Sequence, residues 1–262
     1  MRVLILLFSI SLSTSVWACQ QPITINYAPF VSLLVVKKFF GSFHEQLQQT
    51  SGCAVSYVIQ RNFDEFVAAL YAREHTLAIV PGPYFNVLKQ LNYSAVASQI
   101  QTKHRDLLVI AKKKSKLNSL ADLAGRHVLV NSPLSASGNF FLDTISKLEL
   151  LDKMTIQHLS SYDNMILLVL KGDADAAVII PEYWEALDAS VRNQHLNVVK
   201  KLRVKTSTEF VVLKEREDLA PLVYQALNTG SIKWGKPNKS AVGPKSLEQL
   251  LQLKLQQYQQ SR

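Results

Sequence analysis

The sequence predicts an α/β protein of two lobes, each a mainly parallel sheet flanked by helices. Apolar, β-branched segments alternate with amphipathic helical segments, which favours parallel strands covered on both faces. The same alternation starts again in the middle of the chain. Each half therefore holds about five strands, and two sheets fit better than one. A hydrophobic fraction of 48% over 262 residues also supplies a sizeable core.

The first half of the chain carries the clearest alternation. Apolar residues recur at helical spacing before residue 50, and a β-branched run then follows Gly52. Asn62 and Asp64 are both suited to capping the next helix. The strand that follows this helix is expected to stop at Pro81-Gly82-Pro83. The expected elements are strands at 23–27, 54–59 and 76–80 and helices at 31–47 and 62–70.

The second half repeats this pattern at similar spacing. Gly125 closes a short helix, and a strand then ends at Asn131-Ser132-Pro133. A tail rich in Leu and Gln is expected to form a terminal helix docked on one lobe. The expected elements are strands at 107–110, 127–130, 156–159, 176–180 and 210–213 and helices at 120–124, 139–150, 164–171, 219–227 and 247–258.

Residues 1–18 are predicted to be a secretory signal peptide. A positive start at Arg2 precedes a short apolar core, and Ala18 provides a small residue at a cleavable end. The alternative is a buried N-terminal strand or helix, which the charged start does not favour. Lys37 and Lys38 interrupt the best later candidate for a membrane span. We therefore expect an exported, periplasmic protein without a membrane-spanning helix.

Two cysteines remain after residue 18, and two assignments are open for them. Disulfides persist in exported proteins, so Cys19 and Cys53 are expected to form one. Such a bridge would contribute about 3–4 kcal/mol by restricting the unfolded chain. The alternative is a lipid anchor on Cys19, because Val16-Trp17-Ala18-Cys19 has the rough shape of a lipoprotein cleavage site.

The formal net charge of +9 attracts anions, but it does not identify a nucleic-acid-binding protein. Export argues against nucleic acid as a partner, and the basic run at 112–116 has no interleaved aromatic residues, so a solvated loop edge explains it. The six histidines show no metal-ligand spacing, and no nucleotide loop or nucleophile elbow is present. The sequence therefore predicts no enzyme, no cofactor and no metal site.

The segment Ser135-Ala136-Ser137-Gly138 is the most informative motif. It follows a predicted strand and opens a predicted helix, where backbone N–H groups are unpaired and the helix dipole is positive. Two hydroxyls, and a glycine that lets a ligand approach the backbone, can make this turn a cradle for an anion. The alternative is ordinary helix capping by Ser137.

Four segments, in this order, resemble the periplasmic phosphate/phosphite/phosphonate-binding proteins of ABC transporters. The Ser-x-Ser-Gly turn is the more specific of them, whereas the Asp-Leu-x-Gly stretch is shared by many solute-binding proteins. Together the segments span most of the chain after residue 18. The segments are 63–70 with 77–84, 119–126, 132–138 and 163–177.

The resemblance implies a type II solute-binding fold, in which two crossing strands join two lobes and the ligand lies in the cleft between them. The implied first lobe comprises residues 19–107 together with 207–262. The second lobe comprises residues 108–206. The crossing strands are expected near 107–110 and 210–213, and closure of the lobes about them would trap the ligand.

Carried over position by position, the resemblance places Ser135, Ser137 and the amide of Gly138 on phosphoryl oxygens. Tyr84 would contribute from the opposite lobe, although packing on its own lobe is an equal alternative. Tyr27, at the end of the first strand, is a similar candidate.

Three positions depart from the family pattern. Ala136 stands where the family usually has Thr, Tyr162 where it usually has His, and Phe63 where it often has Tyr. Each change removes or weakens a polar contact, and Tyr162 cannot carry a positive charge near neutral pH. The departures predict a larger or less charged ligand than a free phosphonate.

Glu182 follows a predicted strand, at the edge of the sheet where cleft residues emerge. Its carboxylate can pair with an amino group on a ligand. The alternative is an acidic residue in the first helical turn that stabilises the helix dipole.

The function expected from the resemblance is capture of a small anionic ligand for an ABC permease. The alternative is a sensing module that docks on a membrane sensor kinase or cyclase and binds a different small ligand. In either case the chain is expected to act as a monomer.

Overall fold

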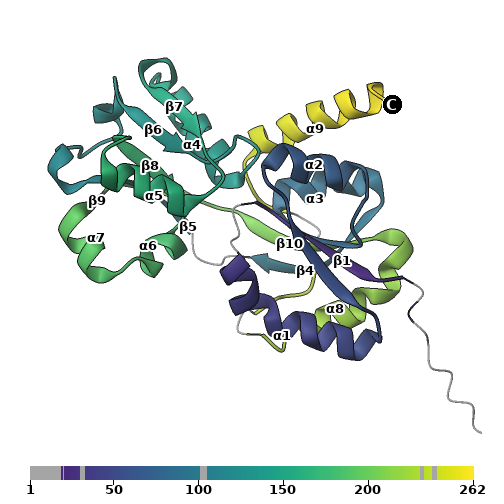
Figure 1. Cartoon of the computed structure of the whole chain (residues 1–262). Coiled ribbons are helices and arrows are strands. Elements are labelled where there is room, and N and C mark those ends of the chain that lie inside the picture. The colour runs from purple at the N-terminus through teal and green to yellow at the C-terminus, as the bar shows by residue number, and fades with distance from the viewer. Residues whose placement is uncertain (1–18, 20, 30–32, 101–104, 231–232, 238–240) are drawn as a thin grey trace, which may run out of the picture.

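The computed structural model describes residues 19, 21–29, 33–100, 105–230, 233–237 and 241–262. The predicted signal peptide at 1–18 and the predicted helix start at Val31 lie outside these residues. The described chain forms two five-stranded sheets with helices against both faces of each (Figure 1). We call each sheet with its helices a lobe, numbered in the order in which the chain enters them.

The sheet of the first lobe has the strand order β2-β1-β3-β10-β4. β2, β1 and β3 pair in parallel, and β10 pairs antiparallel with both β3 and β4. Only β10 therefore opposes the other four strands, so the sheet is mainly parallel in direction. The strands are β1 (Ile23–Tyr27), β2 (Val55–Ile59), β3 (Leu77–Pro81), β4 (Tyr93–Ile100) and β10 (Ser207–Leu213).

The second lobe repeats this topology with the strand order β7-β6-β8-β5-β9. β7, β6 and β8 pair in parallel, and β5 is the one reversed strand, between β8 and β9. The strands are β5 (Arg105–Lys112), β6 (His127–Val130), β7 (Thr155–His158), β8 (Ala176–Ile179) and β9 (Leu196–Val204).

The chain passes twice between the two lobes. It leaves the first lobe after β4 and enters the second at β5, and it returns from β9 to β10 through Lys205 and Thr206. Because β4 pairs with β10 and β5 pairs with β9, the two crossings start and end on neighbouring strands. The predicted boundary at residue 107 falls inside β5.

Helices bury apolar residues on both faces of each sheet. α1 and α8 cover one face of the first sheet, and α2, α3 and α9 cover the other. In the second lobe α4 lies against one face, and α5 and α6 lie against the other. The helices are α1 (Leu33–Ser51), α2 (Phe63–Tyr71), α3 (Gly82–Leu88), α4 (Ala136–Lys147), α5 (Tyr162–Lys171), α6 (Pro181–Ala186), α7 (Ala189–His195), α8 (Ala220–Leu227) and α9 (Lys245–Gln260).

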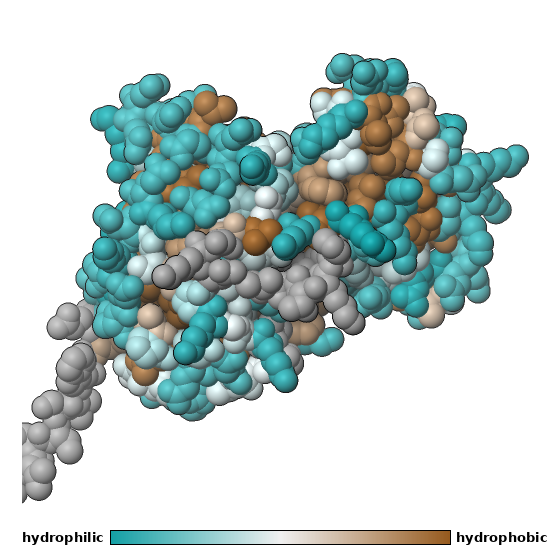
Figure 2. All heavy atoms as spheres, turned by 180° about the vertical axis from the view of Figure 1, so that it is seen from behind, coloured by the Kyte–Doolittle hydropathy of each residue, from teal (hydrophilic) through white to brown (hydrophobic). Residues whose placement is uncertain are grey.

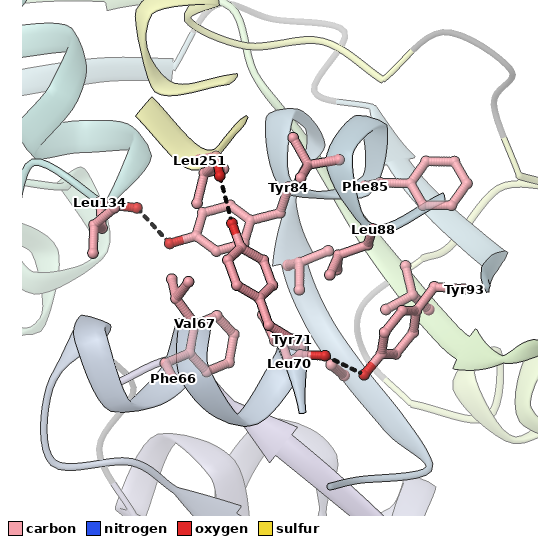
Figure 3. Close-up of a cluster of buried hydrophobic side chains, with 14 of the residues drawn as sticks. Phe66, Val67, Leu70, Tyr71, Tyr84, Phe85, Leu88, Tyr93, Leu134 and Leu251 are labelled. Atoms are coloured by element: carbon pink, nitrogen blue, oxygen red, sulfur yellow. Dashed lines mark hydrogen bonds between the residues drawn. The ribbon is translucent and has the colours of Figure 1, made fainter. Parts of the chain in front are cut away.

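The C-terminal helix α9 docks on the first lobe, as the sequence predicts. Leu247, Leu251 and Leu255 are buried in the apolar cluster shown in Figure 3, where the hydroxyl of Tyr71 donates to the Leu251 carbonyl at 2.7 Å. At its other end α9 reaches the second lobe, because Ser246 Oγ donates to Asn139 Oδ1 of α4 at 2.6 Å.

Several elements differ from the sequence-based expectation. The segment 81–83, expected to be a turn, opens α3 directly, because proline is tolerated in the first turn of a helix. The segment 120–124 forms only a short 3-10 turn at Ala121–Leu123. β9 was missed because its lysines and arginine mask the strand pattern; it is a solvent-facing edge strand, where charged side chains prevent unwanted pairing. The sequence also did not indicate β4 and α7, and it indicated α6 only through the alternative that places Glu182 in a first helical turn.

A disulfide joins Cys19 to Cys53, with the two Cα atoms 4.9 Å apart. It ties the residues before β1 to those before β2, the neighbouring strand. A lipid thioether on Cys19 and this disulfide exclude each other, because both need the same Sγ atom.

Among the described residues, no helix has the length and apolar character to span a membrane. Hydrophilic side chains cover most of the face shown in Figure 2.

Candidate functional site

The candidate site begins at the N-terminus of α4, where Ser135 is the N-cap residue. Its extended backbone ends the turn after β6, and its Oγ atom accepts the N–H of Gly138 at 2.9 Å. The same hydroxyl donates to the Ser132 carbonyl at 2.7 Å. The helix therefore starts at Ala136 rather than near Asn139, and the capping residue is Ser135 rather than Ser137.

The amides of Ala136 and Ser137 occupy the first two positions of α4. Within the described part of the chain neither amide has a hydrogen-bond partner, whereas those of Gly138 and Asn139 are satisfied by Ser135. The dipole of the helix adds partial positive charge at this end. Two adjacent N–H donors are thus available to an anion.

A second helix brings a hydroxyl to the same turn. Tyr162, the first residue of α5, is buried, and its OH lies 2.8 Å from Ser137 Oγ. Ser137 Oγ is also 3.3 Å from Ser135 Oγ. Because β6 and β7 are parallel neighbours, the helices that follow them start at the same edge of the sheet, and this brings the three hydroxyls together.

These groups line a pocket of about 70 Å³, several times the roughly 10–15 Å³ that one water molecule needs. Both lobes contribute to its wall, which carries hydroxyl and apolar groups and no charged side chain among the described residues. The lining residues are Pro81, Leu107, Ser135, Ala136, Ser137, Tyr162, Ile180, Val204, Thr206, Ser207 and Thr208.

Four of the residues that the sequence nominated, Ser135, Ala136, Ser137 and Tyr162, thus lie together on this wall. The sequence did not indicate the opposite wall, which is formed by Pro81 at the end of β3 and by residues 206–208 at the start of β10. The run Thr206-Ser207-Thr208 was a usable signal, because three consecutive hydroxyl residues precede an apolar strand at the second crossing.

Gly138 lies behind the pocket rather than on its wall. Its amide is already bonded to Ser135 Oγ, so it is not available to a ligand in this structure. A Cβ atom at this position would lie 2.3 Å from the carbonyl oxygens of both Asn131 and Ser132. Glycine is therefore required so that α4 can start close against the end of β6.

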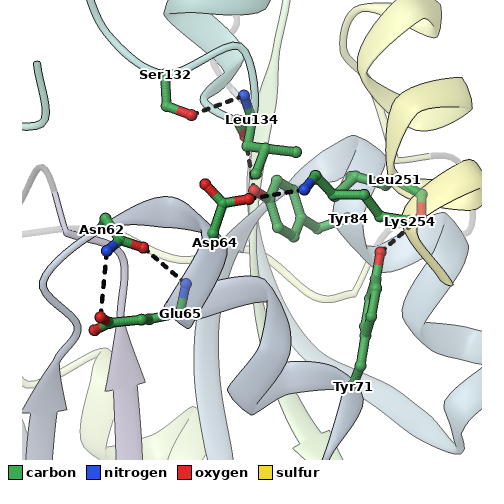
Figure 4. Close-up of polar contacts among 9 residues, drawn as sticks. All are labelled: Asn62, Asp64, Glu65, Tyr71, Tyr84, Ser132, Leu134, Leu251 and Lys254. Carbon is green, nitrogen blue, oxygen red and sulfur yellow. Dashed lines mark hydrogen bonds and ion pairs between the residues drawn. The ribbon is translucent and has the colours of Figure 1, made fainter. Parts of the chain in front are cut away.

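Tyr84 is buried outside the pocket lining and connects the lobes. Its hydroxyl donates to the Leu134 carbonyl at 2.7 Å (Figures 3 and 4). The centroid of its ring lies 5.9 Å from that of Phe66, which belongs to the same cluster (Figure 3). Burial raises the pKa of this phenol well above its usual value, so the group stays protonated and donates. Tyr84 thus fixes the turn before α4 from the first lobe.

Glu182 also lies outside the pocket lining. It is exposed in the first turn of α6, where a carboxylate interacts favourably with the positive end of the helix dipole. Ile180, two residues earlier, lines the pocket instead. No cluster of histidine, cysteine, aspartate or glutamate suited to a metal ion occurs within the described ranges.

Tyr27 belongs to an aromatic cluster in the first lobe, away from the pocket wall. Its hydroxyl lies 2.9 Å from His44 Nε2, and the His44 ring stacks on Tyr57 with centroids 4.9 Å apart. Burial raises the pKa of Tyr27 and lowers that of His44 to about 4. The contact therefore joins two neutral groups.

Acidification is expected to destabilise the protein through His44. Because the folded-state pKa of about 4 lies below the usual 6.5, the unfolded chain binds the extra proton, and stability falls as the pH drops from 6.5 to 4. We expect a loss of about 1–2 kcal/mol, allowing for solvent screening of this partly exposed ring. Urea unfolding at pH 4.5 and 7.5 gives the free energy of unfolding at each pH. The difference between the two values should be smaller for His44→Phe than for the wild type.

The control for this prediction is His195→Phe, at the exposed end of α7. If the free energy of unfolding of His44→Phe changed between the two pH values as much as that of the wild type, the role of His44 would be contradicted.

The chain matches the family model described as "ABC transporter, phosphonate, periplasmic substrate-binding protein" over residues 25–243. No curated protein sequence matches it.

Solved structures with the same fold include PhnD1 from Prochlorococcus marinus (MIT 9301) in complex with methylphosphonate, at a TM-score of 0.69 and 17% identity, covering 90% of this chain and 98% of that one. A binding protein component of an ABC phosphonate transporter from Pseudomonas aeruginosa gives a TM-score of 0.65 and 16% identity, and the match covers 90% of this chain and 87% of that one. The alkanesulfonate-binding protein SsuA from Xanthomonas axonopodis pv. citri, bound to MOPS, gives a TM-score of 0.57 and 21% identity, and the match covers 80% of this chain and 74% of that one.

These matches confirm the resemblance drawn from the sequence, and they confirm two mixed α/β sheets in the type II arrangement. The chain belongs to the phosphonate-binding family of periplasmic substrate-binding proteins of ABC transporters.

Proposed function

We propose that this protein captures a small phosphonate-, phosphite- or phosphate-like oxyanion in the cleft between its lobes and delivers it to an ABC importer. The observation that carries the proposal is that the amides of Ala136 and Ser137, beside a pocket lined with hydroxyls, have no partner among the described residues. Family membership supports the transport role. One structural neighbour, PhnD1 from Prochlorococcus marinus (MIT 9301), was solved in complex with methylphosphonate.

The binding chemistry follows from the groups on the wall. The two amides and the positive end of α4 hold two oxygens of the anion, and Ser137 and Thr208 add hydroxyls from opposite sides. Among the described residues the lining carries no cationic side chain, so the donors that these residues offer to the ligand are neutral. Such a site favours a small anion of low charge, in line with the departures at Ala136 and Tyr162.

Capture proceeds by closure of the lobes about the two crossings. Because both lobes contribute to the pocket wall, a bound ligand stabilises the closed arrangement by its contacts with each. We assign the chain up to the end of β4 and from β10 onward to one lobe, the chain from β5 to β9 to the other, and residues 1–18 to export. The receptor acts as a monomer in the periplasm, and its role consists of binding and release without a chemical step.

Replacing Ala136 by proline tests the proposed anion site. Proline is well tolerated at the first position of a helix, and Ser135 already has the extended backbone that a residue before proline prefers. The substitution removes one N–H donor and should weaken oxyanion binding about 10- to 100-fold, because a charge-assisted hydrogen bond is lost. Affinities are measured calorimetrically for the ligand that stabilises the wild type most.

That ligand is chosen by a thermal-shift comparison of phosphate, phosphite, methylphosphonate and aminoethylphosphonate. A ligand present at 100 times its Kd adds about 2.7 kcal/mol to the free energy of unfolding. The matched control is Ala189→Pro, the same substitution at the first position of α7, away from the pocket. No shift with any of the four anions, or wild-type affinity in Ala136→Pro, would overturn the proposal.

A further inference from the structure

The C-terminal segment 241–260 touches both lobes. Its first residues lie beside the second crossing of the chain, where the Ser207 N–H donates to the Val242 carbonyl at 2.8 Å and the Val242 N–H donates to Ser207 Oγ at 3.0 Å. A Cβ atom at Gly243 would lie 2.5 Å from ring atoms of Pro83, in the first turn of α3. Before it enters α9, the segment therefore passes next to one wall of the pocket.

Polar contacts along its length anchor α9 on the first lobe. Asn86 of α3 donates through Nδ2 to Glu248 Oε2 at 2.7 Å, and Lys254 Nζ lies 2.7 Å from Asp64 Oδ1 of α2 (Figure 4). The hydrogen bond from Tyr71 and the buried leucines of the helix lie between and beside these contacts. Because the anchors are spread over several turns, α9 moves with the first lobe as one body.

The first turn of α9 reaches the second lobe at the start of α4 (Figure 1). Ser246 Oγ donates at 2.6 Å to Oδ1 of Asn139, which is only 7% exposed. Leu134 and Ala136, on either side of the N-cap residue of α4, pack in the same apolar cluster as Leu247 of α9. The contact between α9 and the second lobe therefore falls on the helix start that carries the candidate anion site.

This contact depends on how the lobes are arranged. Ser246 moves with the first lobe and Asn139 with the second, so the lobes cannot separate at this point without breaking the hydrogen bond between them. The hydrogen bond from Tyr84 to the Leu134 carbonyl also joins the two lobes. An interaction that exists in only one of two arrangements shifts the population toward that arrangement.

We propose that segment 241–260 is a strap between the lobes, and that Ser246, acting through Asn139, is a positioning residue that favours the closed arrangement before any ligand binds. Where it concerns affinity, the inference rests on the proposed function. The apparent Kd of a ligand equals the intrinsic Kd divided by the fraction of protein in the competent arrangement. A strap that raises this fraction therefore tightens binding without touching the ligand.

The test measures the separation of the lobes in the ligand-free protein. Spin labels are attached to the full-length chain at Ala68→Cys on α2 and Leu148→Cys at the end of α4, two exposed positions, and their distance distribution is recorded by pulsed electron resonance. The native cysteines are joined to each other and do not react. Ser246→Ala should lower the ratio of closed to open molecules about fivefold, which corresponds to the loss of one hydrogen bond.

Two further serine variants separate the strap from general damage to α9. Ser246→Thr keeps the hydroxyl and should restore the wild-type distances. Ser261→Ala is the matched control, because its hydroxyl donates to the Tyr258 carbonyl within the same helix and does not touch the second lobe. At saturating ligand, all variants should reach the same short distance, whereas damage to α9 would change the distance in the liganded protein as well.

A double-mutant cycle tests whether Ser246 acts through Asn139. Asn139→Ala should shift the ratio of closed to open molecules as much as Ser246→Ala does, and the double variant should add no further shift. Calorimetry with the oxyanion that stabilises the wild type most should show an affinity reduced by up to about fivefold in each of the three variants.

Wild-type distances in ligand-free Ser246→Ala, or fully additive shifts in the cycle, would overturn the strap and would leave the receptor function standing. If none of the oxyanions binds, the receptor function fails, but the ligand-free distances still decide for or against the strap.

Discussion

Reduction of the Cys19–Cys53 disulfide is expected to lower the free energy of unfolding by about 3–4 kcal/mol. The bond closes a loop with a sequence separation of 34, and opening it restores conformational entropy to the unfolded chain. The loop contains β1 and α1, and β1 is paired on both sides within the first sheet. We therefore expect the whole first lobe to lose stability, which urea unfolding with and without reductant will measure.

The control for this prediction is the double variant Cys19→Ser, Cys53→Ser, which should resemble the reduced wild type and should not respond to reductant. Thiol titration verifies that the bond has opened. A fully reduced wild type with an unchanged unfolding midpoint would show that the disulfide adds nothing to stability.

Replacing Gly138 by alanine is expected to cost about 1–3 kcal/mol of stability and also to weaken ligand binding. The added Cβ atom would lie 2.3 Å from the backbone oxygens of Asn131 and Ser132, and backbone atoms cannot move aside as a flexible side chain would. The start of α4 must then shift away from β6. The amides of Ala136 and Ser137 would move with it, so stability and oxyanion affinity should fall together.

Gly41→Ala is the matched control, because Gly41 lies inside α1 with nothing within 4 Å of an added Cβ atom. Alanine there should stabilise the protein by about 0.5–1 kcal/mol through helix propensity and should leave affinity unchanged. Urea unfolding and calorimetry on both variants make the comparison. A Gly138→Ala variant as stable as the wild type would show that the turn before α4 adapts without cost.

The α/β class and most strands could be predicted from the sequence because they depend on local patterns. β8 is a short apolar run, β1 alternates apolar residues with Thr24 and Asn26, and α9 shows its buried leucines at helical spacing. β9 escaped prediction because an edge strand faces solvent and carries lysines that hide the pattern. α6 and α7 are too short for a periodicity to be read.

The site divides in the same way. Ser135, Ala136 and Ser137 could be found because a strand, a serine turn and a helix follow one another directly along the chain. The roles of Tyr84 and Gly138 could not, because they depend on carbonyl oxygens that no sequence pattern locates. The hydroxyls at 206–208 were missed because they are remote in sequence from the serine turn, and only the return of the chain to the first lobe places them opposite it.

The order of residues alone determined two α/β lobes, membership of a binding-protein family and a helix start suited to an anion, since each depends on neighbours in the chain. The tertiary structure decided which groups meet around that helix start. That depends on partners distant in sequence: the hydroxyl of Tyr162 lies 2.8 Å from that of Ser137, and the carbonyl of Leu134 accepts the hydroxyl of Tyr84. A hydrogen bond is set by distance and direction in space, and residue type alone specifies neither.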